Sequence, residues 1–301
     1  MAVAISIKNL KKSYKGTDAV KGISFDVKEG EFFGFLGPNG AGKSSTIHSI
    51  TGICNFNEGS IEVFGHDVVK DYRAARAFIG LSPQEFNLDP FFSIFELMVF
   101  QGGYYGLEIK KAKERAAELL KKFGLWEKKD MTMRALSGGM KRRLTIAQAL
   151  MHEPKILILD EPTAGVDIEL RHELWNFLKE LNEKGTTIVL TTHYIEEAEK
   201  LCDRICIMNK GKIIELDDKD KVMEKFGKSK IAIELAEPLK SIPEKLQAYN
   251  CIIKGNSIEF IEPKSKINGI IKAIDSLNIR IEDIDIKNDS LEDIFLELIR
   301  R

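Results

Sequence analysis

The sequence predicts an α/β protein with a mainly parallel, helix-covered sheet, followed by a smaller α+β domain. Short apolar strands alternate with helical segments after residue 30, as in sheets whose parallel strands are joined by helices. The chain has 301 residues, 44% of them hydrophobic, which is enough for about two domains. Beyond residue 228 the sequence becomes rich in isoleucine and has no glycine-rich loop. We therefore expect domains at 1–228 and 229–301.

Apolar runs and alternation predict the strands of the first domain. Two of them precede residue 30 and are expected near a sheet edge, while a mostly helical region of about 88–152 interrupts the series. The clearest helix is 110–125, where apolar residues recur on one face and Gly124 ends the pattern. A turn at Lys210-Gly211 predicts a hairpin. The predicted strands are 4–10, 22–31, 31–36, 59–68, 155–160, 186–193, 204–209 and 212–216.

The second domain is predicted to follow the order β-α-β-β-α-β-α. Ser290, followed three residues later by Asp293, predicts the N-terminal cap of its last helix. The order resembles a split βαβ, or ferredoxin-like, unit. The predicted strands are 230–236, 251–255, 257–262 and 279–287, and the helices lie at about 243–249, 267–274 and after Ser290.

Composition excludes several function classes. The net charge is -1 and the pI about 6.6, so no general basic field favours nucleic acid. The most apolar window, 91–100, contains Glu96 and is too short to span a bilayer. The start of the chain lacks the layout of a signal peptide. Four cysteines without a second metal-ligand pair predict reduced thiols of the core.

The stretch LGPNGAGKSS (36–45) follows an apolar strand and precedes a helix, and it fits the pattern G-x-x-x-x-G-K-[ST]. Glycines let backbone N–H groups approach phosphate oxygens closely, and the helix N-terminus adds partial positive charge. Lys43 can reach the terminal phosphates, and Ser44 can offer its hydroxyl to Mg²⁺. The alternative is a flexible surface loop, which the flanking strand and helix disfavour. The predicted nucleotide-binding residues are Gly37, Pro38, Asn39, Gly40, Ala41, Gly42, Lys43, Ser44 and Ser45.

Two acids end the buried strand of ILILDEP (156–162). Burying carboxylates is costly unless something uses them. Asp160 is expected to hold Mg²⁺, and Glu161 to polarise the attacking water beside the terminal phosphate. Two exposed acids at the end of a strand are the alternative, which the phosphate-binding loop makes the weaker interpretation.

A second phosphate-binding helix start is predicted in ALSGGMKRRL (135–144). Ser137 can cap the helix, and a plain helix entry would explain the serine. Gly138 and Gly139 in the first turn are harder to explain that way, because glycine weakens helices. We call Ser137, Gly138 and Gly139 the corner. The corner and the loop at 36–45 could bind the same phosphate, either within one chain or between two chains.

Together these motifs resemble the ATP-binding cassette ATPase of ABC transporters over about residues 5–216. The resemblance implies a P-loop NTPase (RecA-like) core with an antiparallel β subdomain and a helical subdomain. It also implies ATP and Mg²⁺ as ligands, and a head-to-tail homodimer in which Ser137, Gly138 and Gly139 face the loop of the other subunit. It implies that Tyr14 stacks on adenine, that Gln84 senses Mg²⁺ and the attacking water, and that His193 contacts the γ-phosphate. It also implies that Asp167 is the acid of a loop, residues 164–167, that crosses between the two ATP sites. Tyr14 as a plain edge aromatic and Gln84 as a solvated side chain are the alternatives.

Met140 and the tail SLEDIFLELI (290–299) resemble the ABC-2 subgroup, which exports drugs, lipids and polysaccharides. That resemblance implies an integral membrane permease as partner and a location at the cytoplasmic face of the cell membrane. A groove near Gln84 would receive a helix of the permease. An importer ATPase and a soluble P-loop enzyme acting on small molecules, nucleic acid or the ribosome are alternative functions. Candidate lining residues of the groove are Phe86, Phe91, Phe92, Ile94 and Phe95, which could equally form a helical core.

Overall fold

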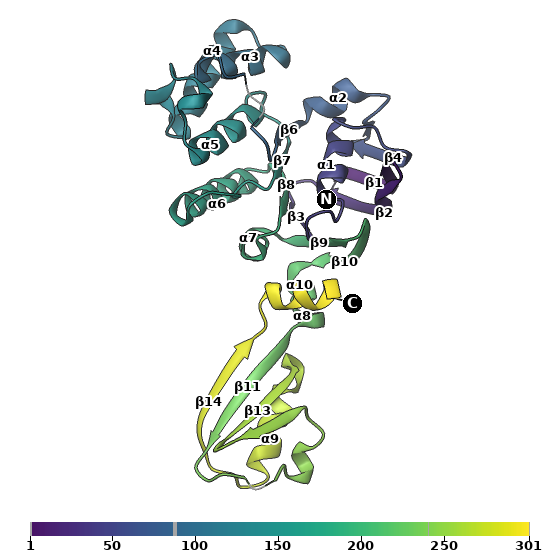
Figure 1. The fold of residues 1–301 in the computed structure, drawn as a ribbon, viewed down its shortest axis with the longest axis vertical. Coiled ribbons are helices and arrows are strands. Elements are labelled where there is room, and N and C mark those ends of the chain that lie inside the picture. The colour runs from purple at the N-terminus through teal and green to yellow at the C-terminus, as the bar shows by residue number, and fades with distance from the viewer. Residues whose placement is uncertain (1, 87–88, 240, 301) are drawn as a thin grey trace. The chain divides into compact units, whose positions relative to one another are not determined.

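The computed structural model describes residues 2–86, 89–239 and 241–300 (Figure 1). The chain forms two compact units, Met1–Leu216 and Asp217–Arg301. Helix α8 (Lys219–Phe226) lies between this division and the predicted boundary at 228/229. Within the described residues, no helix is both long enough and apolar enough to cross a membrane.

The first unit is built on a six-stranded sheet with the order β10-β9-β3-β8-β7-β6. The five strands from β9 to β6 pair in parallel, and β10 joins β9 through Lys210 and Gly211, both at positive φ. The core strands β3, β7 and β8 are buried along their whole length, as expected for a sheet covered on both faces. The strands are β3 (Phe32–Leu36), β6 (Ile79–Ser82), β7 (Ile156–Asp160), β8 (Thr187–Thr192), β9 (Arg204–Asn209) and β10 (Lys212–Asp218).

The N-terminal strands do not lie at an edge of the parallel sheet. They form a sheet of their own, in the order β2-β1-β4-β5, and all of its pairs are antiparallel. Phe25 of this sheet contacts Phe33 and Phe35 of β3, with ring centroids 5.5 and 5.4 Å apart. The two sheets therefore share a core, as the predicted antiparallel subdomain requires. The strands are β1 (Val3–Tyr14), β2 (Thr17–Lys28), β4 (Glu58–Val63) and β5 (His66–Asp67).

Helices lie on both sides of the parallel sheet. Helix α1 lies on the side of the antiparallel sheet, whereas α5 and α6 lie on the other side (Figure 1). The predicted helical region holds α3, α4 and α5, and a capping box of Ser93 and Glu96 starts α3. The helices of the first unit are α1 (Lys43–Thr51), α2 (Tyr72–Ala77), α3 (Ile94–Tyr104), α4 (Ile109–Lys122), α5 (Gly138–Ala149), α6 (Ile168–Glu183) and α7 (Ile195–Leu201), with short 3-10 turns at Trp126–Lys128 and Met133–Ala135.

The second unit has an antiparallel sheet with the order β12-β13-β11-β14. This is the order of the split βαβ, ferredoxin-like unit that the sequence predicts. The helix predicted at 243–249 is only a 3-10 turn, Glu244–Leu246, so α9 is the one full helix between strands of this sheet in the described chain. Ser290 and Asp293 form the predicted cap of the last helix. The elements are β11 (Lys228–Leu235), β12 (Cys251–Lys254), β13 (Ser257–Pro263), α9 (Ile267–Asp275), β14 (Ile281–Asn288) and α10 (Leu291–Arg300).

Candidate functional site

The loop between β3 and α1 needs its glycines for two different reasons. A Cβ atom at Gly37 would clash with the carbonyl oxygen of Met208, and one at Gly42 with the carbonyl oxygen of Ala19. Gly40 has open space around it but a φ of +79°, which side chains rarely tolerate. Backbone crowding and a left-handed turn therefore require glycine in this loop.

Lys43 opens α1 and is only 5% exposed. Its Nζ donates hydrogen bonds to the carbonyl oxygens of Gly37 at 2.6 Å and Pro38 at 3.2 Å. Burial lowers the pKa of Lys43, and the negative charges of Glu161 and Asp160 oppose that shift. The ammonium thus lies in the loop within the field of two carboxylates, with its charge available for an anion.

Asp160 and Glu161 follow one another at the end of β7 and are 3% and 8% exposed. Thr191 of the neighbouring strand β8 pairs with Asp160 in register, and its hydroxyl donates a hydrogen bond to Oδ1 of Asp160. The backbone N–H of Glu161 donates to the carbonyl and to the hydroxyl oxygen of Thr191, at 3.0 and 3.1 Å. These bonds hold Glu161 at a φ of +50°, an uncommon conformation for a residue other than glycine.

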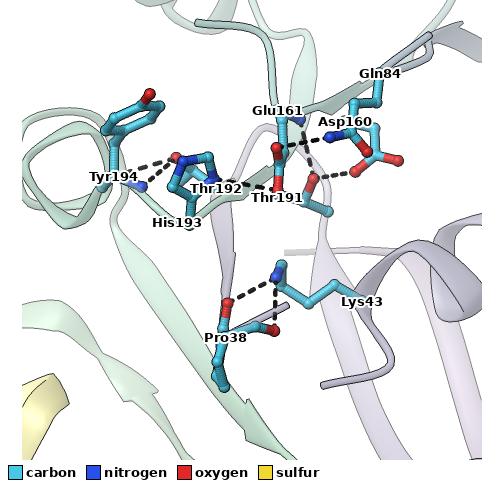
Figure 2. Close-up of polar contacts among 10 residues, drawn as sticks. Pro38, Lys43, Gln84, Asp160, Glu161, Thr191, Thr192, His193 and Tyr194 are labelled. Carbon is cyan, nitrogen blue, oxygen red and sulfur yellow. Dashed lines mark hydrogen bonds and ion pairs between the residues drawn. The ribbon is translucent and has the colours of Figure 1, made fainter. Parts of the chain in front are cut away.

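Three predicted site residues meet at the carboxylate of Glu161 (Figure 2). Nε2 of Gln84 donates to Oε2 of Glu161 at 2.9 Å, and Nδ1 of His193 lies 3.2 Å from Oε1. Gln84 follows β6 and His193 follows β8, on either side of β7 in the sheet. One carboxylate therefore joins the ends of three neighbouring strands, and its charge acts on the lysine of the loop.

Thr191 and Arg142 belong to this site, and the sequence did not single them out. Arg142 of α5 is 3% exposed and donates to the carbonyl oxygens of Pro83 at 2.6 Å and Gln84 at 3.0 Å. Burial lowers its pKa, while Asp160 and Glu161 oppose that shift. Arg142 thus ties the backbone of Gln84 to the helix that begins at Gly138.

The predicted second phosphate-binding corner lies apart from the loop in this chain. Ser137 caps α5 as expected, because its hydroxyl accepts a hydrogen bond from the N–H of Met140 at 3.3 Å. Ser137 and Gly138 are exposed, and α5 lies on the opposite side of the sheet from α1 (Figure 1). Asp167 is exposed too and caps α6, accepting from the N–H of Leu170 at 2.9 Å. Within one chain, both acid and corner face solvent.

Tyr14, at the end of β1, presents a ring that is 44% exposed. Lys12 Nζ lies 4.3 Å from the ring centroid, and the hydroxyl lies 3.5 Å from the sulfur of Cys54. Burial raises the pKa of this hydroxyl, and the neighbouring Cys54 raises it further. The exposed ring face could stack on a flat heterocycle.

The groove residues differ in exposure and fall into three groups. Phe91 and Phe92 are 79% and 39% exposed, whereas Ile94 is completely buried and belongs to the core. Phe86 and Phe95 are half-buried, Phe86 stacking against Arg142 at 4.9 Å. Of the two interpretations offered by the sequence, Ile94 therefore fits the helical core, because the first turn of α3 points it inward.

The chemistry of the site is that of phosphoryl transfer to water. A buried lysine in a glycine-rich loop at the start of a helix suits phosphates, and a carboxylate held by Gln84 and His193 suits activation of water. The described residues contain no cluster of three or more His, Cys, Asp or Glu side chains that could hold a metal ion by themselves. The fold and the site define a P-loop nucleotide hydrolase.

Comparison with known proteins specifies the family. A family model described as ABC transporter matches residues 20–164. The linearmycin resistance ATP-binding protein LnrL of Bacillus subtilis (strain 168) is 45% identical over 223 residues, 74% of this chain and 72% of that protein. Nod factor export ATP-binding protein I of Rhizobium sp. (strain N33) is 46% identical over 210 residues, 70% of this chain and 69% of that protein.

Similar solved structures belong to the same family. An ATP-binding subunit of an ABC transporter superposes with a TM-score of 0.69 at 29% identity, covering 74% of this chain and 93% of its own. The ATP-binding cassette MJ0796, in a dimeric post-hydrolysis state bound to ADP and Pi, gives a TM-score of 0.67 at 29% identity, covering 71% and 98%. The chain belongs to the ATP-binding subunits of ABC transporters and is an ATPase.

Proposed function

We propose that this chain powers export across a membrane by closing, with ATP, into a homodimer that acts on a separate permease. The observation that carries the proposal is the carboxylate of Glu161, which Gln84 and His193 hold beside the lysine of a phosphate-binding loop. A transport ATPase needs such a site, because closing and reopening must follow the presence and loss of one phosphate.

Each residue of the site has a role in this proposal. Residues 37–45 wrap the phosphates of ATP, with Lys43 against the terminal ones. Glu161 takes the proton of the attacking water, Gln84 orients that water, and His193 contacts the γ-phosphate. Tyr14 stacks on adenine through its exposed ring face.

Mg²⁺ fits the donors that this chain offers. Ser44, Gln84 and Asp160 would supply a hydroxyl, an amide oxygen and a carboxylate, all of them the hard oxygen ligands that Mg²⁺ prefers. Because Mg²⁺ usually takes one or two carboxylates together with substrate phosphates, a site without a full protein cage is what the proposal requires. When bound, the ion would neutralise charge on the phosphates.

The exposed position of Ser137 and Gly138 supports a shared site. These residues lie across the sheet from the phosphate-binding loop of their own chain (Figure 1), so Ser137, Gly138 and Gly139 would complete the site of a second subunit. Asp167 would lie between the two sites. The related cassette was solved as a dimer bound to ADP and Pi, which supports a dimer for this chain.

The relatives named for linearmycin resistance and Nod factor export favour an exporter over an importer. Exposed Phe91 and Phe92 are the surface on which we expect a permease helix to dock. The chain would then be held at the cytoplasmic face of the cell membrane by that permease. Purification from detergent-solubilised membranes, with identification of the bound subunit, tests this point. Recovery with an importer permease and an external binding protein would contradict it.

The catalytic assignment is tested with Glu161→Gln and Lys43→Ala. Loss of the general base should slow hydrolysis by about 10²–10⁴-fold while ATP binding persists, so that an ATP-bound dimer accumulates. Lys43→Ala should lose tight ATP binding. Hydrolysis of Glu161→Gln at the native rate would mean that another group is the base.

The shared site is tested by mixing inactive subunits. Ser137→Arg and Lys43→Ala should each be inactive alone. A mixed dimer keeps one intact site, with the loop of one chain and the corner of the other. An equal mixture should therefore recover about a quarter of the native rate, since random pairing makes half of the dimers mixed and each has one working site of two. No recovery, with monomer ATP binding lost in Ser137→Arg, would place the corner in the same chain's site.

A further inference from the structure

The edge strand β14 of the second unit leaves two isoleucines uncovered. Ile284 and Ile286 pair with Ile233 and Ile231 of β11, which are completely buried, so all four side chains point to the face that α9 covers. Yet Ile284 and Ile286 are 37% and 41% exposed. A full ferredoxin-like unit has two helices on this face, but here the first is reduced to the 3-10 turn Glu244–Leu246.

The backbone edge of β14 beside these isoleucines also faces outward (Figure 1). The N–H of Asp289 donates to the carbonyl of Lys228 of β11 at 2.9 Å. Because inward and outward groups alternate along an antiparallel strand, the backbone groups of Asp285 point toward β11. Those of Ile284 and Ile286 point away from the sheet, where the N–H of Ile284 bonds only to the neighbouring carboxylate of Asp283 at 2.8 Å.

We propose that β14 pairs antiparallel with β14 of a second copy of this chain, with the two-fold axis beside Asp285. In this register the outward backbone N–H and C=O groups of Ile284 bond to those of Ile286 of the second copy. This pair forms twice across the two-fold axis, and in each pair the two isoleucine side chains cover one another. On the other face, Asp283 lies opposite Lys287 of the second copy, and this ion pair also forms twice. The two four-stranded sheets become one of eight strands.

Charge decides the occupant and the register. When two copies of the strand IEDIDIKN run antiparallel with Asp285 opposite Asp285, Asp283 faces Lys287 and Ile284 faces Ile286. An acid therefore lies opposite a base, and isoleucine opposite isoleucine. A shift of the axis to Ile286 would place Asp283 opposite Asp289 and leave Ile284 opposite Asn288, whose side chain already bonds to Ser229. The one like-charged contact in the proposed register is Asp285 with itself, and Lys287, 3.3 Å from Asp285 in the same strand, offsets it.

An interface of this kind is two-fold and pairs the same surface of two identical chains, as the proposed ATPase dimer also does. It does not depend on nucleotide, however. The experiment therefore uses the full chain without ATP, so that failure of the pairing and failure of the ATPase dimer are separate results.

Disulfide trapping tests the register. Residues at a non-hydrogen-bonded antiparallel pair have Cα atoms about 4.5 Å apart, within the range of a disulfide. Asp285→Cys should therefore cross-link to itself under mild oxidation about tenfold faster than Asp283→Cys or Lys287→Cys, whose own copies lie four positions out of register. The unchanged chain controls for its native cysteines. Equal rates for the three variants, or none above the unchanged chain, overturn the proposal.

Charge exchange tests the pairing without a cross-link. Lys287→Asp places an acid opposite Asp283 and should weaken dimerisation in sedimentation by about tenfold. Adding Asp283→Lys restores an opposite pair in the same register and should restore dimerisation. The side chain of Lys287 is 76% exposed and Asp283 is exposed as well, so the unit should fold in these variants. If the double exchange dimerises no better than Lys287→Asp, the strands do not pair in this register.

Discussion

Thr191→Val should destabilise the first unit out of proportion to the single atom that it changes. Valine keeps the shape of threonine but removes the hydroxyl that donates to Asp160 and accepts from the N–H of Glu161. Thr191 is completely buried and Asp160 is 3% exposed, so water cannot replace the lost donor. A hydrogen bond to a charged group contributes about 1.5–3 kcal/mol. We expect the free energy of unfolding to fall by about 2–3 kcal/mol, because Asp160 stays buried with one partner fewer.

Tryptophan fluorescence during heating measures this loss in the right unit. The chain has two tryptophans, Trp126 and Trp175, and both lie in the first unit. For a unit of this size, 2–3 kcal/mol corresponds to a fall in the unfolding temperature of about 4–12 °C. Thr46→Val is the matched control, because Thr46 is equally buried but donates to the neutral carbonyl of Gly42 at 2.9 Å. It should lose about 0.5–1.5 kcal/mol. Equal losses in both variants would refute the argument that the charge of Asp160 sets the magnitude.

Three further substitutions test other parts of the site. Arg142→Met removes both hydrogen bonds to the carbonyls before and at Gln84 and should lower kcat while KM for ATP stays near the native value; a changed KM with native kcat would contradict the positioning role. Burial raises the pKa of Glu197, a buried acid bonded to Trp175. Its carboxylate penalises folding once the pH exceeds the ordinary carboxyl pKa, so Glu197→Gln should stabilise the chain near neutral pH and not in acid, as unfolding across pH would show. Gly42→Ala, at a φ of +106°, should cost about 1–3 kcal/mol and weaken ATP binding, measurable by titration calorimetry; native affinity would mean that the loop tolerates a Cβ atom.

The parts of the site that the sequence predicted are those that local pattern encodes. A glycine-rich run between an apolar strand and a helix has few structural explanations. The same holds for two acids, Asp160 and Glu161, at the end of a buried strand. Ser137 is likewise recognised as a helix cap from the residues directly beside it, Gly138 and Gly139. In each case the evidence lies within about ten residues of sequence.

Thr191 and Arg142 were missed because their partners are remote. Thr191 bonds to a residue 31 positions away, and Arg142 reaches the carbonyl of Gln84 over 58. Only the order of strands in the sheet brings these groups together, and one sequence does not reveal that order. For the same reason, the sequence placed β1 and β2 only near a sheet edge, whereas the structure puts them in a separate antiparallel sheet in which β1 is internal.

The order β3-β8-β7 explains why the end of β8 is the sensitive point of this site. The phosphate-binding loop follows β3 and the two acids end β7, so β8 alone lies between them. Its last residues hold the acids that follow β7: Thr191 bonds to Asp160 and Glu161, and His193 lies against Glu161. A displacement of this one strand end would move Glu161, which we propose as the base, and His193, which we propose as the phosphate contact, together. Because of that coupling, we expect Thr191→Val to lower ATP hydrolysis as well as stability.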